Sequence, residues 1–303
     1  MIQTHRHRGA DTGPLPMGSE LIPMIIDERT QKCVAYLVEE DTKGRAPTAT
    51  VFFVNAAAPE FAPGTALLMP YAVTARHAVE DVTPGAKLFL RVNLKDGACC
   101  DLPADTWTVH PNSDVAVCRI ETDLDIDIKG LTAGAMWVGN GGPSENELVV
   151  GDDIAIIGLF TEHPGASRNL PVARFGHVAL LPHEQIELEL YEGLTVKTNF
   201  FVVEVMAWGG NSGSPVFLYW PHHREWKEVG DKGDRGPWLL GLLHGTFCVR
   251  EPLDKPKKPP GEWLVRNNAG LAVVVPAADI LATLDLPSLV EERKQLSLAI
   301  LGK

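Results

Sequence analysis

The sequence predicts an all-β fold. Short runs of aliphatic and β-branched residues recur along most of the chain, and glycine, proline and aspartate separate them, as is typical of strands and turns. The runs cover residues 33–38, 50–54, 87–92, 153–159, 172–180, 201–205, 239–243 and 271–275. With 303 residues and a hydrophobic content of 45%, the chain can bury a substantial core in one or two domains.

A helix start is indicated only near the C-terminus. Ser288 follows a leucine and a proline, and Glu291 lies three residues further along the chain. A serine followed at this spacing by a glutamate forms a capping box, in which each side chain satisfies a free backbone N–H of the first turn. We therefore expect one short C-terminal helix.

A glycine-flanked serine is the most informative local feature. The segment 210–215 has the sequence Gly-Asn-Ser-Gly-Ser-Pro. Gly210 can adopt backbone angles closed to other residues, so its N–H and that of Ser212 can converge on one developing oxyanion. The segment is therefore a candidate nucleophile loop.

Two upstream blocks supply the partners that a serine nucleophile needs. Thr-Ala-Arg-His ends at His77 after a long apolar run, which predicts a histidine where a buried strand gives way to a helical turn. Asp114 precedes Val-Ala-Val, a strand-like stretch in which a buried carboxylate must find a donor. A serine hydroxyl requires a neutral imidazole to accept its proton, and a carboxylate to orient that imidazole.

Each of these features also has an ordinary structural interpretation. Taken singly, Ser212 would be a turn residue, His77 a satisfied core residue and Asp114 a turn former ahead of a strand. Their occurrence together, with these neighbours, favours a catalytic triad.

The three blocks resemble those of the chymotrypsin-like serine proteases, T-A-x-H, D-[IVL]-A-[LV] and G-[DN]-S-G-[GS]-P, and they follow in the same order. The resemblance covers roughly residues 48–280. It implies two six-stranded antiparallel β-barrels with the catalytic site between them, and no metal or organic cofactor. It also implies that Ser212 attacks, His77 transfers the proton, Asp114 orients His77, and the N–H groups of Gly210 and Ser212 form the oxyanion hole.

The resemblance suggests a division of the chain into five parts. These are a lead-in segment (1–32), a first barrel that carries His77 and Asp114 (33–120), a linker (121–148), a second barrel that carries Ser212 (149–280) and a C-terminal helix (281–303).

The resemblance also implies a primary specificity pocket, formed by Met206, Ala207, Leu243, His244, Gly245 and Thr246. Selection of Lys or Arg requires a buried carboxylate, and Met206 offers none, so an uncharged side chain is favoured. The nucleophile segment also resembles that of glutamyl endopeptidases, in which a pocket histidine binds a substrate carboxylate. His244 could take that role, or it could equally lie behind the triad and bond Asp114.

Two further features refine the comparison. The segment from Ala269 onward resembles the end of HtrA-type protease domains, which continue into PDZ domains, whereas this chain stops at Lys303. Asn211 stands where trypsin-type zymogens carry an aspartate that pairs with a freed N-terminus. We therefore expect no PDZ domain and no activation by N-terminal cleavage in the trypsin manner.

Charge and composition restrict location and partners. The net charge of −12 argues against a nucleic-acid surface. We find neither a run of about 20 apolar residues that could span a membrane nor a secretory apolar segment after the basic N-terminus. Five cysteines, an odd number, do not form a paired disulfide framework, so we expect a cytoplasmic protein. We expect residues 247–268, rich in proline and lysine, to form a long loop, which is the candidate for a gate or for the docking surface of a regulatory protein partner; the ordinary alternative is a tolerated surface insertion.

The sequence therefore predicts a serine endopeptidase that cleaves protein or peptide substrates. Two alternatives remain. One is a peptide-binding module that keeps the protease fold but does not cleave, and the other is an esterase that uses the same triad.

Overall fold

The computed structural model describes residues 26, 28–59, 67–136, 148–161, 163–191, 194–207, 209–219, 238–252 and 264–301. Within them strands predominate, and each of the eight apolar runs lies in a strand to within one residue. The described helices are few. Those before the C-terminal helices are short: α1 (Glu28–Gln31), α2 (His77–Glu80) and the 3-10 turn η1 (Ala133–Ala135). This part of the chain is therefore mostly β, with few helices. Most of the lead-in segment and part of the linker lie outside it.

The N-terminal half is a curved sheet. Its strands follow the order β5 (Cys99–Pro103), β4 (Lys87–Asn93), β1 (Val34–Asp41), β2 (Gly44–Ala57), β3 (Leu68–Thr74), β7 (Ala116–Arg119) and β6 (Thr108–Val109), with β8 (Leu131–Thr132) paired to β2. We expected a closed barrel here, but no pairing joins the end strands β5 and β6 in the described residues. Strand β6 has two residues, and β5 ends at Pro103, which has no N–H to donate. The two end strands therefore present few backbone groups for hydrogen bonds to each other.

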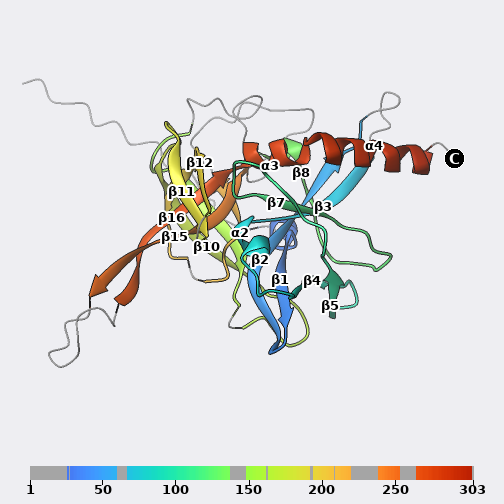
Figure 1. The fold of residues 1–303 in the computed structure, drawn as a ribbon, viewed down its shortest axis with the longest axis horizontal. Coiled ribbons are helices and arrows are strands. Elements are labelled where there is room, and N and C mark those ends of the chain that lie inside the picture. Colours follow the sequence, from blue (N-terminus) through green and yellow to red (C-terminus); the bar gives the residue numbers. More distant parts are fainter. Residues whose placement is uncertain are drawn as a thin grey trace, which may run out of the picture.

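The C-terminal half contains a closed six-stranded barrel (Figure 1). Its strands, in order round the barrel, are β10 (Pro171–Leu180), β13 (Phe201–Glu204), β16 (Leu264–Pro276), β15 (Trp238–Pro252), β14 (Pro215–Tyr219) and β9 (Asp153–Leu159). Each neighbouring pair is antiparallel. β11 (Ile186–Tyr191) and β12 (Leu194–Thr198) form a separate hairpin.

The apolar core has three main layers, because side chains alternate between the two faces of a strand. On β2, Phe52 faces the barrel and packs in a cluster with Phe217 of β14 and Leu242 of β15. Its neighbours Val51 and Phe53 pack on the other face of the N-terminal sheet. A third cluster fills the barrel itself. Both faces of β2 are therefore buried, which explains its nearly continuous apolar run.

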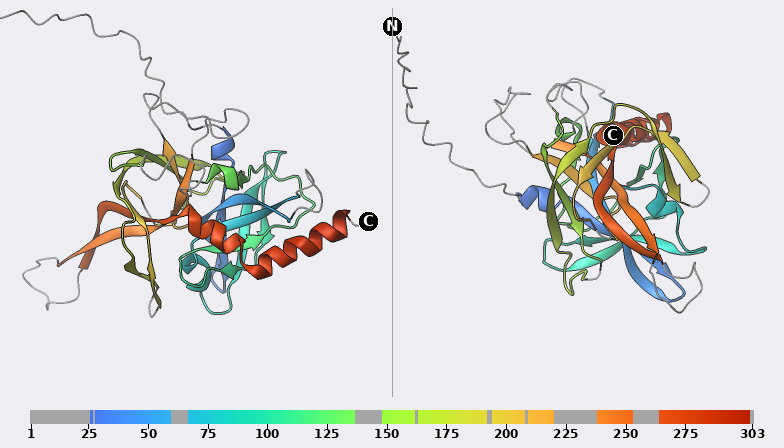
Figure 2. Two further views of the ribbon diagram at one scale, coloured as in Figure 1. Left: turned by 90° about the horizontal axis from the view of Figure 1, so that it is seen from above. Right: turned by 90° about the vertical axis from the view of Figure 1, so that its left-hand side faces the viewer.

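The chain ends in two helices rather than one short helix, α3 (Ala277–Leu284) and α4 (Pro287–Leu301) (Figure 2). α4 begins at Pro287, so Ser288 lies inside the first turn and does not cap the helix as we expected. Proline suits the first helical position because its fixed φ is helical and its missing N–H is not needed there. None of the helices in the described ranges is long and apolar enough to cross a membrane.

Candidate active site

His77 lies at the position that the sequence predicts. β3 ends at Thr74, and α2 begins at His77 directly after the buried strand. The preceding residue, Arg76, binds Glu80 through Nε at 2.6 Å and donates through Nη1 to the carbonyl of His110 at 3.1 Å. These bonds attach α2 to the segment that leads to Asp114.

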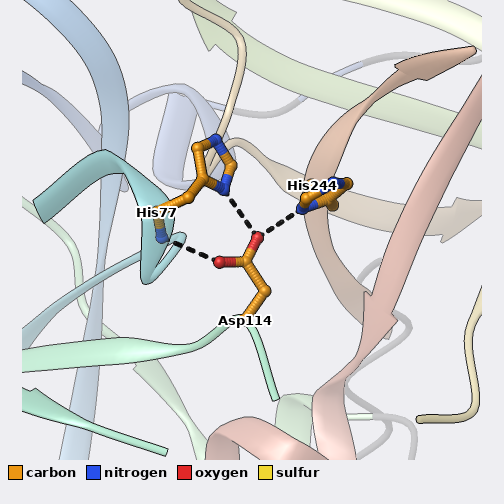
Figure 3. A group of neighbouring side chains, drawn as sticks. All are labelled: His77, Asp114 and His244. Atoms are coloured by element: carbon orange, nitrogen blue, oxygen red, sulfur yellow. Dashed lines mark hydrogen bonds and ion pairs between the residues drawn. The ribbon is translucent and has the colours of Figure 1, made fainter. Parts of the chain in front are cut away.

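Asp114 is fully buried and binds His77 twice (Figure 3). Its Oδ1 accepts the backbone N–H of His77 at 2.9 Å, and its Oδ2 accepts the ring Nδ1–H at 2.8 Å. Because the carboxylate is an acceptor, the proton of the neutral ring is on Nδ1 and the lone pair is on Nε2. The neutral ring of His77 is thus held with its free lone pair on Nε2.

The ionisation of Asp114 reflects two opposed effects. Burial by itself raises the pKa of the carboxyl, whereas hydrogen bonds from His244 and His77 lower it. The hydrogen bonds prevail, and the pKa falls from 3.8 to about 2. Asp114 is therefore anionic at neutral pH and can stabilise a positive charge on His77.

His244, on β15, is the third member of this group. Its Nδ1 donates to Oδ2 of Asp114 at 2.6 Å, and its ring meets that of His77 edge-on, with centroids 4.9 Å apart. Of the two roles that the sequence left open for His244, the structure shows the contact with Asp114. Since Nδ1 is engaged by the carboxylate, this nitrogen is not available to bind a substrate carboxylate in a pocket.

Ser212 lies beside this group, but its hydroxyl does not point to His77. The hydroxyl donates to the backbone carbonyl of His244 at 3.0 Å, and no hydrogen bond between Ser212 and His77 occurs in the described part of the chain. The adjacent Gly213 packs against Thr74 and Ala75, just before His77. The structure thus brings His77, Asp114 and His244 into contact and places Ser212 next to them.

The nucleophile loop depends on its two glycines. Gly210 has φ +86° and Gly213 has φ +79°, both in the left-handed region that other residues rarely adopt. A Cβ on Gly210 would overlap the side chain of Thr161, and one on Gly213 would overlap the Thr74 hydroxyl and a backbone carbonyl. The loop thus has the sharp turn that the sequence predicts, while the oxyanion role of the Gly210 and Ser212 N–H groups stays a prediction.

Thr50, in the middle of β2, is a site residue that the sequence analysis missed. Its N–H donates to the carbonyl of Ser212 at 2.9 Å, and its hydroxyl donates to that of Gly210 at 3.0 Å. The same hydroxyl accepts the N–H of Leu159 at 3.2 Å. Thr50 therefore joins the N-terminal sheet, the nucleophile loop and the barrel. The sequence could not identify Thr50 as a site residue, because a single threonine in an apolar run predicts only that its buried hydroxyl needs hydrogen-bond partners, and not which residues these are.

Asp279 of α3 is a second residue that the sequence did not indicate. Its carboxylate accepts the hydroxyl of Ser113, the residue before Asp114, at 2.5 Å. The same Oδ2 lies 3.5 Å from the hydroxyl of Thr198, at the end of β12. α3 is thereby connected to the segment that carries Asp114.

The residues predicted to form a specificity pocket differ in their surroundings. Met206 is 61% exposed, whereas Ala207 and Leu243 are buried. His244, Gly245 and Thr246 are partly buried on β15. Arg174 of β10, which we did not single out, donates through Nη1 to the carbonyl of Met206 at 3.0 Å. A shared role of the six residues in substrate selection stays a prediction.

His77, Asp114 and His244 are also the one group in the described ranges whose ligand atoms are close enough to surround a cation, within 4.8 Å of one another. Both Nδ1 atoms, however, carry the protons that they donate to Oδ2. A cation bound at these atoms would have to displace both protons, so the observed geometry is that of a hydrogen-bonded group.

No known protein family matches the chain, and no curated protein is similar to it in sequence. Solved structures that are similar in part include the active form of the Rv3671c protease from M. tuberculosis, with 14% identity and a TM-score of 0.46. That match covers 84% of this chain and 80% of the protease chain. The inactive form matches with 14% identity, a TM-score of 0.44, and coverage of 84% and 88%.

Proposed function

We propose that this protein is a serine endopeptidase that hydrolyses peptide bonds through an acyl-enzyme. The observation that carries the proposal is the buried Asp114, which accepts both the ring Nδ1–H and the backbone N–H of His77. A buried anion that fixes the tautomer of a partly exposed imidazole is the arrangement that makes histidine a general base.

The proposed reaction begins when the Ser212 hydroxyl turns from the His244 carbonyl to Nε2 of His77. Ser212 attacks the substrate carbonyl while His77 takes the hydroxyl proton, and Asp114 stabilises the resulting imidazolium. The N–H groups of Gly210 and Ser212 bind the oxyanion. His77 then gives its proton to the leaving amine, and a water molecule hydrolyses the acyl-enzyme by the same steps.

The test is labelling of the native chain by a fluorophosphonate probe, which reacts with an activated serine. We expect labelling to disappear with Ser212→Ala and to fall by about 10³- to 10⁴-fold in rate with His77→Ala or Asp114→Asn. Ser214→Ala is the matched control, because Ser214 is a buried serine of the same loop whose hydroxyl has no hydrogen-bond partner among the described residues. Labelling that survives Ser212→Ala would exclude Ser212 as the nucleophile.

The non-cleaving peptide-binding module is the second candidate. The observation that favours it is the hydrogen bond of Ser212 to the His244 carbonyl, which leaves the hydroxyl away from His77. A folded native chain that no fluorophosphonate labels, but that binds peptides, would support this candidate. An esterase would be labelled like a protease, so digestion of a peptide library separates those two.

The remaining parts of the proposal concern selectivity and setting. An uncharged residue before the scissile bond is expected, because Met206 brings no carboxylate to the predicted pocket. A cytoplasmic location and control by a protein partner that docks on 247–268 are also part of the proposal.

A further inference from the structure

Asp114 lies just outside the strand pairing of its own segment. β7 begins only at Ala116, which pairs with Thr74 of β3 and with Val109 of β6. Ser113 and Asp114 precede this pairing, and both are fully buried. The strand ladder therefore fixes the residues that follow Asp114, whereas contacts of other kinds hold Ser113 and Asp114 themselves.

The side chain of Ser113 makes such a contact. Its hydroxyl donates to Oδ2 of Asp279 at 2.5 Å, a distance typical of a hydroxyl bound to a carboxylate. Asp279 lies in the first turn of α3, where the free backbone N–H groups favour a negative charge. Further along the helix, the Thr283 hydroxyl donates to the Asp279 carbonyl at 2.6 Å. The acceptor of the Ser113 hydroxyl is thus held on a regular helix.

α3 in turn packs on the strands that follow the nucleophile loop. Its buried Ile280 belongs to the same apolar cluster as Phe217 of β14 and Leu242 of β15. β14 begins at Pro215, shortly after Ser212, and Pro215 pairs with Leu242. α3 also packs against β7, the strand that follows Asp114 (Figure 1). The helix therefore lies between the strand that follows the serine and the strand that follows the aspartate.

Building on the function proposed above, we propose that Asp279 is a positioning residue of the active site, which places Asp114 relative to Ser212. The connection runs from the barrel through α3 to the Asp279 carboxylate, and from there through Ser113 to Asp114. It joins the two halves of the molecule, because Asp114 leads into the N-terminal sheet and Ser212 into the barrel. Asp279 acts through Ser113 and not on the substrate.

The position of Asp114 matters because this residue also determines the position of His77. Asp114 accepts both the backbone N–H and the ring Nδ1–H of His77, so a shift of the segment that carries Asp114 would move or release the imidazole. A general base works only within hydrogen-bond reach of the proton that it takes. A misplacement of about 1 Å can lower a rate by about 100-fold. The bond from Ser113 to Asp279 restricts such a shift.

The other end of the same segment offers a matched comparison. Arg119, the last residue of β7, binds Glu292 of α4 at 2.7 Å. The C-terminal helices are thus bonded to the segment at both ends, in each case through a carboxylate. Only the bond of Asp279 lies next to Asp114, however, whereas that of Glu292 lies beyond the paired strand. Loss of the second bond should therefore leave the active site in place.

The first test is a double-mutant cycle, read by fluorophosphonate labelling of the full chain. We expect Ser113→Ala and Asp279→Ala each to slow labelling by about 10- to 100-fold, because each removes the same bond. The double variant should be no slower than the slower single variant, since one interaction cannot be lost twice. Asp279→Asn keeps an acceptor oxygen and should recover part of the rate. Losses that multiply in the double variant would overturn the proposal.

Glu292→Ala is the matched control for these rates. It removes a bond between a C-terminal helix and the same segment, and the labelling rate should stay within about 2-fold of the native rate. Urea unfolding shows which fraction of each variant is folded under the labelling conditions. An equal loss of rate in Glu292→Ala and Asp279→Ala, or a loss that only follows the unfolded fraction, would overturn the positioning role.

Proton NMR with isotope-labelled histidines reports on the same bond without any catalysis. The Nδ1–H of His77 donates to a carboxylate, so its resonance lies far downfield, and its absence in His77→Gln identifies it. We expect Asp279→Ala to shift this resonance, Asp279→Asn to shift it less, and Glu292→Ala to leave it unchanged. An unchanged resonance in Asp279→Ala would contradict the proposal.

The two measurements together separate the positioning role from the proposed function. If the native chain is labelled but Asp279→Ala changes neither the rate nor the resonance, the catalytic function stands and the positioning role fails. If the folded native chain is not labelled but Asp279→Ala still shifts the His77 resonance, the positioning of Asp114 stands and the proposed reaction fails.

Discussion

At the scale of single residues, the site is organised around the carboxylate of Asp114. Its Oδ2 accepts Nδ1–H groups from both His77 and His244, and its Oδ1 accepts the backbone N–H of His77. A buried charge is tolerated only when hydrogen bonds replace its hydration. The three donors therefore explain why an aspartate at zero exposure remains ionised.

The low pKa of Asp114 predicts a loss of stability in acid. The carboxyl has a pKa of about 2 in the folded chain against an ordinary 3.8. A lowered pKa contributes stability that is complete above about pH 4 and disappears as the pH falls through 2, here roughly 2 kcal/mol. In urea unfolding from pH 5 to pH 2, the difference in free energy of unfolding between the native chain and Asp114→Asn should shrink by that amount. A difference that stays constant over this range would contradict the expectation.

We expect the hydrogen bond from His244 to stabilise the Asp114 carboxylate, so a small apolar residue at position 244 should not replace it. In His244→Ala, Oδ2 loses one of its two imidazole donors, so we expect fluorophosphonate labelling to slow by about 10-fold or more. His244→Gln, whose amide can donate to the same oxygen, should restore part of the rate. His177→Ala is the control, because the His177 side chain is 57% exposed on β10. Equal rates for the Ala and Gln variants would show that the donor at 244 has no effect.

At the scale of the elements, the nucleophile loop is held from two sides. Thr50 of β2 bonds the carbonyls of Gly210 and Ser212, and Asn211 donates its side-chain amide to the carbonyl of Leu159 on β9 at 3.2 Å. The loop therefore lies where the N-terminal sheet meets the barrel. Its shape depends on both halves of the molecule.

Gly213 of this loop and Gly209, just before the loop, give a matched comparison. Gly213→Ala places a Cβ at φ +79° against Thr74 and Thr50, and we expect it to reduce the free energy of unfolding by at least about 1–3 kcal/mol and the labelling rate by about 100-fold. Gly209→Ala meets no atom within 4 Å, and should change stability by less than about 0.5 kcal/mol. The measurements are urea midpoints and labelling rates. Similar effects of the two substitutions would argue against tight packing at Gly213.

At the scale of the whole molecule, the two C-terminal helices join parts that are distant in the sequence. α3 packs against β15, β16 and β7. The buried Arg293 of α4 donates to the carbonyl of Ala57 on β2 at 3.0 Å and to that of Leu284 on α3 at 2.8 Å. α4 is therefore attached both to the N-terminal sheet and to the helix that follows the barrel.

Removal of this attachment should destabilise the fold. Arg293→Met keeps most of the side-chain volume but leaves two carbonyls without their donor, which predicts a loss of about 2–4 kcal/mol in the free energy of unfolding. Lys294→Met is the control, because the Lys294 side chain is 47% exposed and should matter little. Urea unfolding of both variants checks the difference. A loss below about 0.5 kcal/mol for Arg293→Met would show that the helix is held by its apolar contacts alone.

The sequence by itself determined the features that depend on neighbouring residues. The strands follow from the apolar runs, the position of His77 from the junction of a buried strand with a turn, and the bend of the nucleophile loop from Gly210 and Gly213. These are local preferences of side chains and backbone, so they can be predicted from short segments.

Tertiary structure alone decided what depends on residues far apart in the chain. The strand order of the N-terminal sheet, the place of His244 behind Asp114, and the anchoring by Thr50 and Asp279 all arise where segments meet in space. Nothing in the local sequence specifies these contacts, because a buried polar group takes whichever partner the packed chain brings within hydrogen-bond distance.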